Sequence, residues 1–250
     1  MIPIRAHRQS LALAAALCPI LFFACGRVPG QFEILNDQVP IAGCSIPVTP
    51  DVYRGTGRVD LSIVRSDFPA AYFFFPLVEN NLPGSMGDID PNQIQLSGFN
   101  VDITAIGEPS DAVKAVFASP AAAPFIHYQT TWSGGVSSGG GHVSASVEAL
   151  PVPLAQQLLA MGDIGAAPSL TVNLRIQALG TTNSGRSLQS DPFDFPVEVC
   201  AGCLVANKAS CPFGAAPTNL GNACNPAQDE PVDCCTDNGV LVCPPTVAAQ

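Results

Sequence analysis

A period-two alternation of apolar and polar residues runs through much of this chain and restricts it to folds built from half-buried strands. The longest run extends from Leu170 to Ala178, and a second run, Phe193 to Val199, follows after a turn-rich interval. Shorter alternations occupy 59–63, 101–104 and 143–147. Such strands place one face on a core and the other in water, which antiparallel sheets allow.

Helix-forming sequence is scarce. Pro153 to Met161 has apolar residues at helical spacing and Gly162 just beyond, which predicts one short helix. Ala71 to Val78 contains four consecutive aromatic residues and predicts a strand buried on both faces. We therefore expect a mainly β fold, an antiparallel β-sandwich (immunoglobulin-like or related) with one short crossover helix; a β-barrel is the alternative.

Cysteines define a separate C-terminal segment. Seven of the ten lie within the 44 residues from Cys200 to Cys243, a stretch that reads as too small and too polar to bury a core. Seven cannot all pair among themselves, so Cys44 is predicted to bond to one of them, and adjacent Cys234 and Cys235 should bond to different partners. The remaining connectivity is open. The cysteines expected in disulfides are Cys44, Cys200, Cys203, Cys211, Cys224, Cys234, Cys235 and Cys243.

The N-terminus has the pattern of an export signal. A basic start with Arg5 and Arg8 precedes an uncharged apolar run from Ser10 to Ala24. This run is shorter than the roughly 20 residues that a transmembrane helix needs, so a removable signal peptide is favoured over a permanent anchor. An exported protein occupies a compartment in which disulfides persist.

The end of this run, Leu21-Phe22-Phe23-Ala24-Cys25-Gly26, resembles the lipobox of bacterial lipoproteins, in which a small residue precedes the cysteine that receives lipid. Phe22 and Phe23 depart from the usual leucine and small residue. Cleavage before Cys25 removes Cys18, and lipid on Cys25 leaves eight cysteines, an even number that can pair completely. An ordinary secretory cleavage nearby is the alternative and would leave one cysteine unpaired.

Charge excludes one class of partner. Cleavage after Ala24 would leave 226 residues with 8 basic and 20 acidic side chains, a net charge of −12, so we expect no nucleic-acid partner. The predicted organisation is a lipoprotein signal peptide (1–24), a tether with an edge strand near Phe32 to Val39 (25–50), the β-sandwich (51–199), the cysteine-rich module (200–243) and a short tail (244–250).

The pair Cys200-Ala201-Gly202-Cys203 fits a structural disulfide, half of a zinc site or a redox dithiol. Redox pairs of this spacing open a helix in a thioredoxin-like fold, and zinc requires a second pair at matching spacing. Neither context is evident in this sequence. We favour structural disulfides and expect no metal site and no cofactor.

Two further motifs have weaker contexts. Gly135-Val136-Ser137-Ser138-Gly139 satisfies the G-x-S-x-G pattern of serine hydrolases, with His127 and His142 nearby, but the pattern requires a strand before and a helix after it. Here a strand follows, so a hairpin loop is favoured. Asp88 to Asn92 imitates half of a calcium loop without the required glycine and glutamate, so turn and capping roles are favoured.

Three aromatic side chains could form a platform for a sugar ring. Trp132, Tyr128 and Tyr53 are the candidates, but Trp132 is the only tryptophan in the chain. A single tryptophan makes a poor stacking surface. We therefore favour packing roles for these three side chains.

Several segments resemble the sequences of uncharacterised predicted lipoproteins of myxobacteria: Leu77 to Leu82, Phe195 to Leu204, Asn222 to Asp229 and the Cys234-Cys235 pair. The resemblance implies export and an envelope location and brings no known activity. We expect a non-enzymatic protein that is held on the outer membrane by lipid on Cys25. Its loops would bind an envelope protein or a polysaccharide. An envelope serine hydrolase using Ser137 is the alternative.

Overall fold

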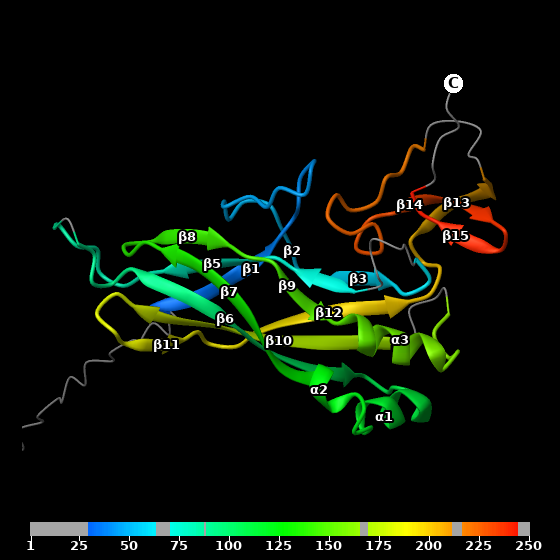
Figure 1. Ribbon diagram of the computed structural model, residues 1–250, viewed down its shortest axis with the longest axis horizontal. Coiled ribbons are helices and arrows are strands. Elements are labelled where there is room, and N and C mark those ends of the chain that lie inside the picture. Colours follow the sequence, from blue (N-terminus) through cyan, green and yellow to red (C-terminus); the bar gives the residue numbers. More distant parts are fainter. Residues whose placement is uncertain (1–29, 64–70, 88, 166–169, 212–216, 245–250) are drawn as a thin grey trace, which may run out of the picture.

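Two long strands form the centre of the structure, a computed structural model that describes residues 30–63, 71–87, 89–165, 170–211 and 217–244 (Figure 1). Strands β6 (Ile94–Ile106) and β10 (Leu170–Thr182) pair antiparallel along their length. The apolar residues predicted to face the core in the second of these strands, from Leu170 through Ala178, are all buried. The prediction of a mainly β protein is confirmed.

The largest sheet has the order β3-β12-β10-β6-β7, with β11 paired to β10 outside this path. Its other strands are β3 (Gly57–Asp60), β7 (His127–Val136), β11 (Ser187–Gln189) and β12 (Phe193–Cys200). Strand β3 pairs with β12 in parallel, so the sheet is mixed and not purely antiparallel. Alternation predicts a half-buried strand but does not indicate the direction of its partner.

A second sheet has the order β2-β1-β5-β8, and a separate pair is formed by β4 and β9. The strands are β1 (Phe32–Gln38), β2 (Tyr53–Arg54), β4 (Tyr72–Phe74), β5 (Pro76–Asn80), β8 (Gly141–Ser144) and β9 (Val147–Leu150). The predicted strand 71–78 is thus divided between β4 and β5. The Phe75 amide donates to the Asp37 carboxylate (2.7 Å), and Pro76 has no N–H to donate, so the strand ladder is interrupted there.

Within the described residues, three helices interrupt the strands: α1 (Asp111–Phe117), α2 (Ala123–Ile126) and α3 (Val152–Ala160). The Ser110 hydroxyl accepts a hydrogen bond from the Val113 amide and caps α1. Helix α3 begins and ends one residue before the predicted helix and connects β9 to β10. The helices lie at the same end of β6 and β10 (Figure 1).

Side chains from the two larger sheets share one hydrophobic core. At its centre, the ring of Phe195 lies 5.1 Å from that of Phe74 and 6.1 Å from that of Tyr72, between ring centroids. The strands curl at bulges, one of them beside Gly98, whose φ is 153°. A Cβ at this position would lie 1.9 Å from the Thr130 carbonyl oxygen, so only glycine permits this approach of β6 to β7.

The segment predicted as a tether contains a fully integrated strand. β1 pairs with β5 from Phe32 to Asp37, and both Phe32 and Ile34 are buried in the core. Among the described residues, its other edge is paired at Asp37 and Gln38 alone, through β2. The folded part therefore begins by Phe32.

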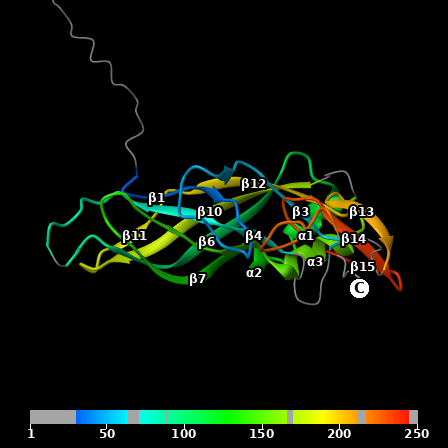
Figure 2. The same ribbon diagram turned by 90° about the horizontal axis from the view of Figure 1, so that it is seen from above.

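The cysteine-rich segment contains a third sheet of β13 (Val205–Ser210), β14 (Val232–Asp237) and β15 (Val240–Val242). β13 and β14 are parallel. The expectation that this segment buries no core is wrong, because it surrounds a small cluster completed by Ile63 from outside the segment. The other buried members of this cluster are Leu204, Ala227, Val232, Cys234 and Cys243. Figure 2 shows this sheet at the opposite end of the molecule from β11.

Candidate functional site

Four disulfides use all eight cysteines of the described residues. The bridge from Cys44 joins the N-terminal stretch to the C-terminal segment across 180 residues of sequence, the connection that the cysteine count predicts. Adjacent Cys234 and Cys235 bond to different partners, also as predicted. The pairs are Cys44–Cys224, Cys200–Cys203, Cys211–Cys235 and Cys234–Cys243.

The Cys200–Cys203 disulfide lies beside the buried carboxylate of Asp60. The two sulfurs and a carboxylate oxygen are close enough together for one metal ion to contact all three. Both sulfurs are bonded to each other, so neither is the thiolate that zinc requires. The Asp60 carboxylate accepts hydrogen bonds from the amides of Gly202 (2.7 Å) and Leu204 (2.9 Å) and from the amide and hydroxyl of Ser62. This arrangement fixes the loop that carries the disulfide.

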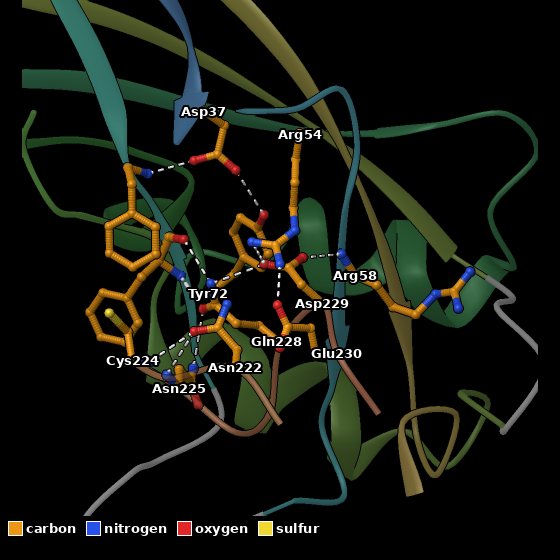
Figure 3. A network of polar contacts seen from close by, with 12 residues as sticks. Asp37, Arg54, Arg58, Tyr72, Asn222, Cys224, Asn225, Gln228, Asp229 and Glu230 are labelled. Carbon is orange, nitrogen blue, oxygen red and sulfur yellow. Dashed lines mark hydrogen bonds and ion pairs between the residues drawn. The ribbon is translucent and has the colours of Figure 1, made fainter. Parts of the chain in front are cut away.

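A buried polar network lies where β1, β2, β4 and the 222–230 segment meet (Figure 3). The Tyr72 hydroxyl donates to Asp37 (3.4 Å), and both side chains are inaccessible or nearly so. The Arg54 guanidinium forms ion pairs with Asp229 (3.4 Å) and Glu230 (2.6 Å). The carboxyl groups of Asp37, Asp229 and Glu230 therefore lie around the Arg54 guanidinium.

Burial changes the acidity of this network. It raises the pKa of Asp37 to about 8; the Phe75 amide opposes the rise, the Asp229 carboxylate adds to it, and the Arg54 guanidinium opposes it. Burial also raises the pKa of Asp229, against the opposing effect of Arg54. Asp37 therefore holds a proton at neutral pH, which reduces the repulsion between carboxyl groups.

The same network attaches the cysteine-rich segment to the β domain. The Gln228 side chain accepts from the Phe73 amide (2.9 Å) and donates to the Phe73 carbonyl (3.1 Å), as a neighbouring strand would. The Asn225 side chain donates to the Ala71 carbonyl (2.7 Å), and the Asp229 backbone amide donates to the Arg58 carbonyl (2.8 Å). Since its central acid and phenol are shielded from solvent, the network joins segments and does not offer these groups to a substrate.

The G-x-S-x-G motif is divided between a strand and a turn. Ser137 is exposed and follows β7, and β8 begins at Gly141. Neither histidine forms a hydrogen bond with Ser137 in the described part of the chain, because His127 is bonded to Asp102 and His142 to Glu79. The strand-to-helix elbow of a hydrolase is absent from this described segment.

The acidic loop before β6 is closed by its own hydrogen bonds. Asp90 accepts from the Ser138 hydroxyl (2.8 Å) and amide (3.2 Å) and from the Asn92 amide (3.0 Å). Partial burial raises the pKa of Asp90, but the hydrogen bonds from Ser138 and Asn92 outweigh it, and the net shift is downward. Asp88, the other acid of the calcium-like motif, lies outside the described residues. Turn and capping interactions thus account for Asp90.

The three aromatic residues do not form one platform. Tyr128 and Trp132 pack against the core from β7, and the Tyr128 hydroxyl donates to the Glu148 carbonyl (2.5 Å). Tyr53 is exposed on β2, a strand of the other large sheet. Packing roles fit the two strand β7 residues.

Cys25, the predicted lipidation site, lies outside the described residues, as does the whole predicted signal peptide. In the described part of the chain, no helix is long and apolar enough to cross a membrane. No protein-family model, curated protein or solved structure matches the sequence. The disulfides themselves indicate an exported protein or an otherwise oxidising environment.

Sequence reasoning missed the acids of the buried networks, Asp37 and Asp60. Both sit in strands where a polar residue is expected to face water. Apart from Ser62 beside Asp60, their hydrogen-bond partners come from other segments, so no local pattern identifies their burial. The density of Asn, Gln and Asp in 222–229, close to Cys224, was the one available signal of a polar junction.

Proposed function

We propose that this protein is a bacterial lipoprotein of the cell envelope, cleaved before Cys25 and anchored by lipid on that cysteine, with a non-enzymatic binding or structural role. The two larger sheets, which share one core, form the β-sandwich of this proposal. The outer membrane is the proposed location, and an envelope protein or a polysaccharide is the proposed partner. In this proposal the loops of the sandwich bind the partner, and the disulfides of the cysteine-rich segment stiffen one end of the protein.

One observation carries the proposal: the eight cysteines that follow Cys25 are all paired with one another. Cys25 has no partner among them, and Cys18 would leave with the signal peptide. An unpaired thiol is unusual in a protein exposed to an oxidising compartment. A thioether to diacylglycerol accounts for this cysteine.

The closeness of the folded part to Cys25 gives a second argument. Gly30 already accepts a hydrogen bond from the Asn81 side chain (3.4 Å), and the Gln31 carbonyl accepts one from the Asn81 amide (2.9 Å). Five residues extend at most about 17 Å, so the β domain would be held within that distance of the lipid. A short connection of this kind suits a protein that acts close to the membrane surface.

Membrane association tests the proposal. Wild-type protein and the Cys25→Ser variant are expressed with the native signal peptide, and their membranes are extracted with detergent and phase-separated. The wild type is expected in the detergent phase, because two acyl chains give stable anchoring, and it should incorporate labelled palmitate. The variant should appear unlabelled in the aqueous phase. Equal partitioning of both forms into the aqueous phase would refute lipid anchoring.

A further inference from the structure

The loop between β5 and β6 carries the two most exposed large apolar side chains of the described residues. The relative accessibilities are 104% for Met86 and 79% for Ile89, against 62% for the next, Leu220. In both views the β5–β6 loop extends beyond the sheets, at the end opposite the β13–β15 sheet (Figures 1 and 2). Leaving two such side chains in water forfeits the stabilisation that burial would bring, so a surface that covers them is expected.

This loop begins beside the point where the chain enters the fold. Asn81, the first residue after β5, is hydrogen-bonded to both Gly30 and Gln31. Met86 is five positions after Asn81, and Cys25 is five positions before Gly30. At about 3.4 Å per residue, neither segment can extend further than roughly 17 Å. The loop and Cys25 therefore have equal reach from one shared position in the fold.

The base of the loop is firmly held. Asp90 is bonded to Ser138, and the Asn92 side chain donates to the Pro83 carbonyl (2.8 Å). The Asn183 side chain donates to the Asp90 carbonyl (2.9 Å), which ties in the turn after β10. These contacts direct the Asp90 carboxylate back toward the protein and leave Met86 and Ile89 at the tip.

We propose that Met86 and Ile89 insert into the lipid layer that holds Cys25 and form a second, shallow contact with the membrane. This inference rests on the lipid anchor proposed above. Two side chains of this size would insert only as far as the boundary between lipid headgroups and acyl chains, where interfacial segments bury their apolar side chains. The exposed Arg186, in the turn bonded to the same loop, would lie at the level of lipid phosphates.

Two contacts fix an orientation that one flexible anchor would not. With the β5–β6 loop on the membrane, the cysteine-rich end faces away from the lipid, because it lies at the opposite end of the molecule (Figure 1). The anchor supplies most of the affinity, and the loop supplies direction. The loop contact is therefore expected to change the posture of the protein on the membrane more than the amount bound.

A tryptophan reporter tests the contact in the lipidated full-length protein. Trp132→Phe removes the only native tryptophan, and Met86→Trp or Ile89→Trp introduces a reporter at the tip. Leu220→Trp, at the next most exposed large apolar position of the described residues and within the cysteine-rich segment, is the matched control. Each protein is reconstituted into vesicles of phosphatidylethanolamine and phosphatidylglycerol with brominated acyl chains, and vesicle flotation measures anchoring separately.

The loop reporters are expected to show blue-shifted emission and quenching by brominated chains, and the Leu220→Trp reporter neither. Proteins that float with the vesicles but whose loop reporters emit and quench like the control would overturn the loop contact and leave the anchor intact. Proteins that do not float would overturn both the anchor and the contact. Two reporter positions are used so that the test still holds if one of the two replacements disturbs the turn.

Discussion

Removing the Cys44–Cys224 disulfide should cause one of the largest losses of stability available from a change outside the core. The bridge closes a loop with a sequence separation of 180 residues. In the chain-entropy model, a loop of that length restricts the unfolded chain by about 5 kcal/mol, compared with about 3 kcal/mol for a loop near ten residues. The double variant Cys44→Ala/Cys224→Ala removes the bridge without leaving a free thiol.

Backbone strain at Cys44 does not affect the comparison between the wild type and the Cys44→Ala/Cys224→Ala variant. Cys44 has a φ of 56°, a left-handed conformation that is unfavourable for any residue with a Cβ. Alanine retains a Cβ, so this strain is the same in both proteins. The matched control is Cys234→Ala/Cys243→Ala, whose bridge has a separation of only 9 residues.

Urea denaturation of the oxidised proteins gives the free energy of unfolding by linear extrapolation. The Cys44 variant should lose about 5 kcal/mol, and for a chain of this size its melting temperature should fall by roughly 10–20 °C. The control should lose about 3 kcal/mol from chain entropy. A loss below about 2 kcal/mol for the Cys44 variant would refute the reasoning, since the long loop would then be restrained by other means.

Three further changes are expected to have defined effects. The folded pKa of Asp37 lies above its unfolded value, so its contribution to stability is complete below pH 4 and is lost as pH rises toward 8. The free energy of unfolding, measured by urea titration at each pH, should therefore decline less steeply over this range in Asp37→Asn than in the wild type. The same decline in both proteins would contradict this. Gly57→Ala would place a Cβ 2.3 Å from the buried Tyr72 hydroxyl, so calorimetry should show a loss of about 1–3 kcal/mol or more. A fluorophosphonate probe should leave folded wild-type protein unlabelled, because neither His127 nor His142 is hydrogen-bonded to Ser137; labelling that Ser137→Ala abolishes would support the hydrolase alternative.

The sequence predicted those elements whose pattern is local. Leu170 to Ala178 alternates in the sequence and is alternately buried in β10. The helix near Pro153 was found from its spacing and flanking residues. The bridge from Cys44 follows from counting alone, because seven cysteines in one segment leave one without a partner.

The features that the sequence did not predict depend on contacts between distant segments. Asp60 occupies a polar position in an alternating strand, where a residue is expected to face water. The loop from Cys200 to Leu204 covers it instead, and two backbone amides of this loop donate hydrogen bonds to its carboxylate. Asp37 is buried and accepts hydrogen bonds from the Tyr72 hydroxyl and the Phe75 amide, which lie 35 and 38 positions further along the chain. No pattern within either strand carries information about these partners, which lie from 35 to 144 positions away.

The intact mass of the N-terminal peptide tests the central claim most directly. Protein purified from its native membranes, digested and analysed by mass spectrometry, should yield a peptide that begins at Cys25 and carries the mass of diacylglycerol on sulfur, with or without a third acyl chain on the amine. A peptide that begins elsewhere, or one in which Cys25 is an unmodified thiol, would contradict lipid anchoring and the membrane contact that rests on it.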